Sequence, residues 1–173
     1  MTPTSRIEHP QHPDLSAFEH VRDPCLRRFL AHYLDLRNGR RVPYRNQISP
    51  IDFPDLLGIV FLYEFDPVSQ DFYIRLAGDH VARMLRTARA GSKLSEVFPP
   101  DALPICLTPC VMHNVGRVFH NLGGTGTGER IAMPLLGDDG EPAFFLGATT
   151  YSLAPDPAHG TDETPVRITY TPL

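Results

Sequence analysis

The sequence predicts an α+β domain, in which a five-stranded antiparallel sheet carries short helices on one face and follows an amphipathic helix. Three observations lead to this fold class. Apolar residues recur at helical spacing after Asp23, they alternate with period two in the middle and late parts of the chain, and prolines and glycines separate these runs. The order helix, two strands, several short helices and three strands packs most simply as one sheet crossed by helices.

Composition fits one globular domain and argues against several functions. The chain has 173 residues, 42% hydrophobic and 21% charged, with a net charge of -4. This charge gives no bulk attraction to nucleic acid or to an anionic membrane. The sequence has no apolar run long enough to span a membrane and no signal peptide, so we expect a cytoplasmic protein. Three cysteines predict reduced thiols, not a disulfide framework.

The chain divides into a tail, a body and a second tail. Residues 1–20 contain prolines and histidines without an apolar period and are predicted to be a mobile tail. Residues 21–153 form the predicted domain. Residues 154–173 are a proline-rich tail in which only Val166 to Tyr170 alternates like a strand, one that pairs with a neighbouring strand or with a second subunit.

The first element of the body is an amphipathic helix. Asp23 is a good N-cap, Pro24 a good first helical residue, and Asn38-Gly39 ends the run. The apolar positions with helical spacing are Leu26, Phe29, Leu30, Tyr33 and Leu34. Because this stripe needs a partner, we expect the helix to be a transmitter or a dimer surface.

A β-hairpin follows at residues 59–66 and 71–79, joined by a proline-containing turn. Strand alternation places one set of side chains on each face: Phe72, Ile74 and Leu76 on one, Tyr73, Arg75 and Ala77 on the other. An arginine among apolar neighbours indicates a paired charge or a contact to a ligand.

Helical fragments and three strands complete the body. Residues 79–91 and 92–98 predict short helices, and residues 101–116 predict a helix bent by Pro104 and Pro109. Residues 116–122, 129–137 and 142–153 predict strands. A glycine stretch, GGTGTG, joins the first two of these strands, and GDDG predicts a hairpin turn between the last two.

The glycine stretch does not have the features of a phosphate-binding loop. A Walker-type loop requires lysine and then serine or threonine after its last glycine, whereas Glu129 and Arg130 follow Gly128. Pro134 also lies where a dinucleotide-binding helix would run. We therefore interpret GGTGTG as a mobile connection between two strands.

Three segments resemble a known family. They are YLDLRNGRRVPYRNQISPIDFPDLLGIVFLYEF, YIRLAGDHVARML and IAMPLLGDDGEPAFFLGAT. Together with the order of elements they resemble the PAS domains of bacteria, in particular a single-domain group with an N-terminal helix. The most specific string is Gly39, Arg40, Pro43, Arg45 and Pro50. The resemblance implies a sensory or ligand-binding domain, often dimeric and of unknown ligand, and does not imply a catalytic site. We expect the domain to act in signal transduction.

In such a fold we expect a cavity between the helices and the sheet. The candidate ligand-binding residues are Tyr73, Arg75, His80, Met84, Cys110, His113 and Met133. Arg75 suits a carboxylate or another anion, although it is also suited to pair with an acidic side chain. The identity of the cofactor or ligand is unknown, and we expect output through a partner protein.

Two alternatives stay open at this point. Cys106, Cys110 and His113 would share one face of the predicted bent helix, where they could bind zinc or haem iron, although a plain buried face explains them better. An isomerase or dehydratase would draw on Asp79, His80, His113, His120 and Glu129, but no spacing among them compels an acid-base role.

Overall fold

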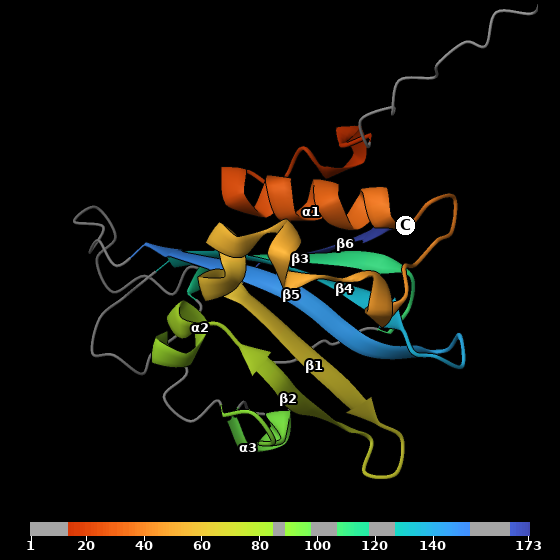
Figure 1. The fold of residues 1–173 in the computed structure, drawn as a ribbon. Coiled ribbons are helices and arrows are strands. Elements are labelled where there is room, and N and C mark those ends of the chain that lie inside the picture. The colour runs from red at the N-terminus through yellow and green to blue at the C-terminus, as the bar shows by residue number, and fades with distance from the viewer. Residues whose placement is uncertain (1–13, 85–88, 98–106, 118–126, 153–166) are drawn as a thin grey trace, which may run out of the picture.

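The structure, a computed structural model, describes residues 14–84, 89–97, 107–117, 127–152 and 167–173. Among these residues, six strands form one antiparallel sheet in the order β2-β1-β5-β4-β3-β6 (Figure 1). The strands are β1 (Val60–Asp66), β2 (Asp71–Ala77), β3 (Cys110–Arg117), β4 (Thr127–Leu136), β5 (Pro142–Ser152) and β6 (Arg167–Pro172). The helices are α1 (Pro24–Leu36), α2 (Asp79–Met84) and α3 (Leu94–Val97), with 3-10 turns η1 (Ser16–Phe18), η2 (Arg45–Gln47), η3 (Pro50–Asp52) and η4 (Pro54–Ile59). The predicted α+β class is confirmed.

Helix α1 forms as predicted and packs on one face of the sheet. The Asp23 carboxylate accepts hydrogen bonds from the backbone N–H groups of Cys25 and Leu26, and Pro24 is the first helical residue. Asn38 and Gly39 adopt positive φ angles of 44° and 81°, which ends the helix.

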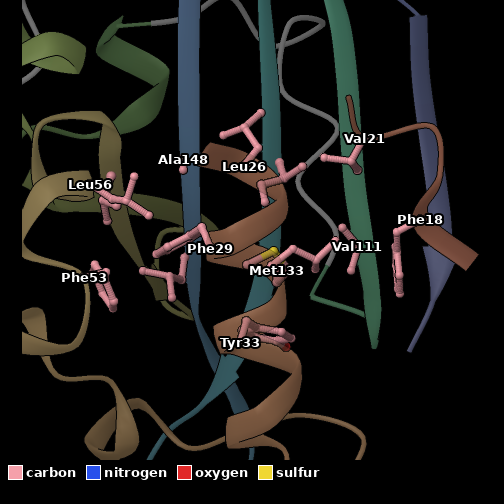
Figure 2. Close-up of a cluster of buried hydrophobic side chains, with 14 of the residues drawn as sticks. Phe18, Val21, Leu26, Phe29, Tyr33, Phe53, Leu56, Val111, Met133 and Ala148 are labelled. Atoms are coloured by element: carbon pink, nitrogen blue, oxygen red, sulfur yellow. The ribbon is translucent and has the colours of Figure 1, made fainter. Parts of the chain in front are cut away.

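The apolar stripe of α1 is covered by the chain's own sheet (Figure 2). Phe29 and Tyr33 are buried in a cluster that includes Met133 of β4 and Ala148 of β5. Fully burying a side chain of this size stabilises the fold by about 1.5–3 kcal/mol. The apolar stripe for which we expected a partner is therefore covered by the sheet. It no longer supports homodimerisation through α1.

The opposite face of the sheet carries α2 and α3, which lie on the other side from α1 in Figure 1. Val81 of α2 and Leu94 of α3 pack there against Phe61, Ile74 and other apolar side chains of the strands. Helices thus cover both faces, α1 and the 3-10 turns on one and the short helices on the other. We call these the α1 face and the α2/α3 face.

The predicted hairpin of β1 and β2 is confirmed, with one irregularity. Leu62 pairs with Leu76 and Tyr63 pairs with Ile74, so Arg75 is an extra residue in a β-bulge. Beyond the bulge the alternation is reversed. Leu76 therefore shares a face with Leu62 and not, as predicted, with Ile74.

The predicted bent helix over residues 101–116 is wrong from Cys110 onward, where the chain forms β3. Val111 and Met112 are buried on opposite faces, as an extended chain requires. The β-branched residues Val111 and Val115 favour a strand, and the apolar run was too short to separate the two periods. Residues 116 and 117 of the strand expected at 116–122 end β3, and its remaining residues and most of the GGTGTG connection lie outside the described residues.

Both ends of the described chain extend beyond the predicted domain. Phe18 of η1 is buried in the α1-face cluster. The strand predicted at residues 166–170 is present as β6, which pairs with β3 and makes the sheet six-stranded instead of five-stranded. The packed body therefore reaches past the limits of 20 and 153 that composition suggested. None of the described helices combines the length and the apolar character needed to cross a membrane.

Candidate functional site

A buried arginine lies on the α2/α3 face. Strand alternation directs Ile131 into the α1-face cluster and Arg130 to the other side, where only 6% of Arg130 is exposed. Its Nε donates a hydrogen bond to Thr149 Oγ1 at 3.1 Å, and its guanidinium lies 5.1 Å from the centre of the Phe61 ring. A charge at this depth is costly unless hydrogen bonds and nearby charges stabilise it.

Other polar side chains are associated with Arg130. Asn114 of β3 and Thr149 of β5 are its register partners, and its charge acts on Tyr63 of β1 and Tyr151 of β5. With Arg130 we call these residues the polar cluster. Tyr63 Oη and Asn114 Oδ1 are buried and have no hydrogen-bond partner among the described residues. Most buried polar atoms in native proteins have a partner, and an exception calls for an explanation such as a bound molecule.

Burial keeps the two phenols of the cluster neutral. It raises the pKa of Tyr63, and the positive charge of Arg130 opposes this shift only in part. Burial also raises the pKa of Tyr151 to about 12, again against the effect of Arg130. Both hydroxyls are therefore hydrogen-bond donors at neutral pH, and the cluster as a whole suits an anion or a strong acceptor.

The sheet brings these residues together from four neighbouring strands. Arg130 is paired in register with Thr149 on one side and with Asn114 on the other. Close packing of β1 on β5 depends on Gly147, because a Cβ there would lie 2.2 Å from the ring of Phe61. Glycine at this position leaves room for the Phe61 ring, over which the Arg130 guanidinium lies.

The predicted residues Tyr73 and Arg75 lie elsewhere. Arg75 is on the α1 face, where its Nε forms an ion pair with Glu64, the arrangement that we weighed against a ligand contact. The Glu64 hydrogen bond and charge raise the pKa of Arg75 further. Tyr73 is half-buried beside Lys93, whose Nζ is 5.6 Å from the ring centre. Arg75 also lines an open cavity of about 450 Å³ on the α1 face.

Three other predicted residues are dispersed. His80 on α2 is exposed, with its ring close to Gly58 of η4. Met84 is buried on the same helix. Met133 is fully buried under α1, on the face opposite to α2 (Figure 2). These residues do not line one cavity, because His80 and Met84 come from α2 and Met133 comes from the opposite face of the sheet.

His113 and Glu129 form a buried contact at the start of α1. His113 Nε2 lies 2.8 Å from a Glu129 carboxylate oxygen, and Glu129 also accepts hydrogen bonds from the backbone N–H groups of Arg22 (2.7 Å) and Asp23 (2.9 Å). The His20 ring meets the His113 ring edge to face, with centres 4.9 Å apart. The carboxylate thus ties the segment before α1 to strand β4.

This arrangement bears on the metal and enzyme alternatives. Cys110 and His113 are three residues apart on a strand and so point to opposite faces, which removes the helix face proposed for zinc or haem; Cys106 lies outside the described residues. Glu129 holds two backbone N–H groups besides His113 and so acts as a structural acceptor. Asp79 and His80 are exposed on α2, and His120 is not among the described residues.

The family string of residues 39–50 forms the connection from α1 to the sheet. Arg40 lies over the ring of Tyr44, with 5.5 Å between the guanidinium and the ring centre. The Pro43 carbonyl accepts a hydrogen bond from Leu136 N at 3.0 Å, which attaches this segment to the end of β4. Arg45 and Pro50 begin the 3-10 turns η2 and η3, and Gly39 has the positive φ noted above.

Sequence reasoning missed the polar cluster. The signal that drew attention to Arg75, an arginine among apolar residues of a strand, is equally present at Arg130 in ERIAMPLL. Arg75 belongs to an edge strand and a bulge, where half of its side chain reaches solvent. Arg130 belongs to a central strand, and only the strand order distinguishes the two positions.

Comparisons with known proteins place the chain in a family. Neither curated proteins nor solved structures gave a match. A family model described as PAS domain matches residues 21–150, which is most of the chain. This range contains α1, the 3-10 turns η2 to η4 and strands β1 to β4 entirely, with nearly all of β5. The chain therefore belongs to the PAS domain family.

Proposed function

We propose that this PAS domain is a sensory module that binds a small carboxylate on its α2/α3 face and reports the occupancy to a partner protein. A sensory role in general follows from the family. The observation that supports a carboxylate ligand is the buried Arg130 guanidinium, whose charge acts on a buried Tyr63 hydroxyl that has no hydrogen-bond partner among the described residues.

The roles of the residues follow from their chemistry. Arg130 supplies charge and up to two parallel N–H donors to a carboxylate. Tyr63 and Tyr151 donate O–H groups, and the Asn114 amide recognises a further polar group such as a hydroxyl or an amine. The Phe61 ring forms an apolar floor. Hydroxy acids and amino acids fit this set better than purely apolar acids.

Signalling requires that the ligand favour one conformation over another. The cluster spans β1, β5, β4 and β3, and Glu129, next to Arg130, fixes the segment before α1. A change at Arg130 is thus connected to the position of α1. A partner protein that binds α1 would detect this change. The partner and the oligomeric state stay predictions.

Native mass spectrometry and a thermal-shift panel test the proposal. The panel contains small hydroxy acids and amino acids, each beside its neutral amide. We expect a carboxylate to raise the melting temperature of the protein and its amide to have little effect, because ligand that binds only the folded state stabilises it. Arg130→Met should remove the response, and Tyr63→Phe should weaken it.

The matched control is Arg83→Gln, which changes an exposed arginine of α2 and should keep the full response. A protein purified without any bound small molecule, and whose melting temperature no carboxylate raises, would contradict the proposal. So would a response that Arg130→Met leaves unchanged.

A further inference from the structure

The α1 face contains a second candidate site, separate from the polar cluster. An open cavity of about 450 Å³ lies between the 3-10 turns and strands β1 and β2. Its wall is mainly apolar and includes Phe53, Leu57, Val60, Leu62 and Leu146. This volume is within the usual range for small-molecule sites. Few polar side chains line the cavity, and Arg45 and Arg75 are two of these side chains.

The bulge in β2 aims Arg75 at this cavity. Because Arg75 is the extra residue between the pairs Leu62–Leu76 and Tyr63–Ile74, its side chain lies on the α1 face beside Glu64. Bulges often re-aim a side chain next to a site. Because Glu64 is already paired with Arg75, its carboxylate is poorly placed to bind a cationic ligand in this cavity.

Arg45 is held by the turn in which it lies. The Gln47 side chain accepts a hydrogen bond from Tyr44 N at 2.8 Å and donates one to the Leu36 carbonyl at 3.1 Å. These bonds fix η2 against the end of α1. Arg45 lines both this cavity and an adjoining depression that also contains Glu64 and Arg75. Its charge therefore stands at the junction of the two hollows.

We propose that this cavity binds an amphipathic monocarboxylate, of the class of medium-chain fatty acids. The alkyl chain would lie along Phe53, Leu57 and Leu62, and the carboxylate would meet Arg45 beside the Arg75–Glu64 pair. The lining of the cavity supports an anion, because among the described residues it contains two guanidiniums, Arg45 and Arg75, and one carboxylate, Asp79. Glu64, Asp138 and Asp139 line only the adjoining depression.

Titration of the full chain with decanoate, followed by amide NMR and calorimetry, tests this site. Shift changes should centre on the amides of Gly58, Gly78 and Leu62 and spare those of Arg130 and Thr149. Decanol, which has the same chain without the charge, should bind more weakly. Changes confined to Arg130 and Thr149 would overturn this inference while supporting the polar cluster, so the two proposals fail separately.

Variants sharpen the test. Arg45→Gln should weaken decanoate binding at least about tenfold, because it removes charge-assisted hydrogen bonds to the carboxylate, and should leave decanol binding within about twofold. Arg41→Gln changes an exposed arginine outside the cavity and is the matched control. Leu57→Glu should abolish decanoate binding. Absence of binding to the wild type, or equal affinity of Arg45→Gln and wild type for decanoate, would overturn the proposal.

Discussion

Tyr33 and Tyr63 are buried to almost the same degree on opposite faces of one sheet, with 1% and 2% of each exposed. The Tyr33 hydroxyl donates a hydrogen bond to the Pro134 carbonyl at 2.7 Å, whereas the Tyr63 hydroxyl has no partner among the described residues. The α1 face thus supplies an acceptor for its buried tyrosine, although His32 Nε2 on this face also has no hydrogen-bond partner among the described residues. The α2/α3 face contains buried polar atoms that have no hydrogen-bond partner among the described residues, and stability alone does not explain this.

The largest effect should come from opening the α1 face. Phe29→Ala removes a fully buried ring that meets Phe53 edge to face at 5.1 Å. We expect a loss of about 3–5 kcal/mol in the free energy of unfolding, measured by urea denaturation. A loss below about 1 kcal/mol would mean that α1 is not seated on the sheet as described. Phe65→Ala, at a half-buried position on β1, should cost clearly less.

The Glu129 contact is the next largest. Glu129→Ala leaves His113 and the N–H groups of Arg22 and Asp23 without their acceptor, so we expect a loss of about 2–3 kcal/mol. Hydrogen exchange should show faster opening of the first turn of α1. Glu141→Ala, at an exposed position in the β4–β5 turn, is the control and should change stability by less than about 0.5 kcal/mol.

The two tyrosines give the direct comparison. Tyr33→Phe should cost about 1 kcal/mol, because the Pro134 carbonyl loses its donor. Tyr63→Phe should leave the free energy of unfolding unchanged or raise it by up to about 1 kcal/mol, because it removes a buried hydroxyl that lacks a partner. Chemical denaturation of both variants without ligand measures this. Equal losses would remove the distinction between the faces.

The smallest effect concerns pH. Burial and the neighbouring His113 lower the pKa of His20 below 6.5, with Glu129 opposing them. The unfolded chain therefore binds a proton more readily than the folded one, and stability should fall as pH drops below 6.5. His20→Gln should flatten this part of the pH profile. An unchanged profile would show that His20 does not titrate differently in the folded state.

The sequence was a good guide where one local pattern determines one element. Asp23-Pro24 and Asn38-Gly39 predicted both ends of α1 to within two residues, and the β1–β2 hairpin formed as expected. It misled where two periods compete over a short run, as at Cys110 to Arg117, which forms a strand and not a helix. The sequence did not indicate which arginine is buried. Arg75 and Arg130 have similar neighbours in the sequence, and only the strand order decides which side chain is buried.

Glu129 and Arg130 are consecutive residues, and yet they belong to opposite sides of the sheet. The first fixes the segment that leads into α1, and the second lies in the polar cluster. Because side chains alternate along a strand, a twist of this one stretch of β4 displaces both groups in opposite senses. The shortest route from the polar cluster to the start of α1 therefore crosses a single peptide bond through the thickness of the sheet, with no need to travel around its edge.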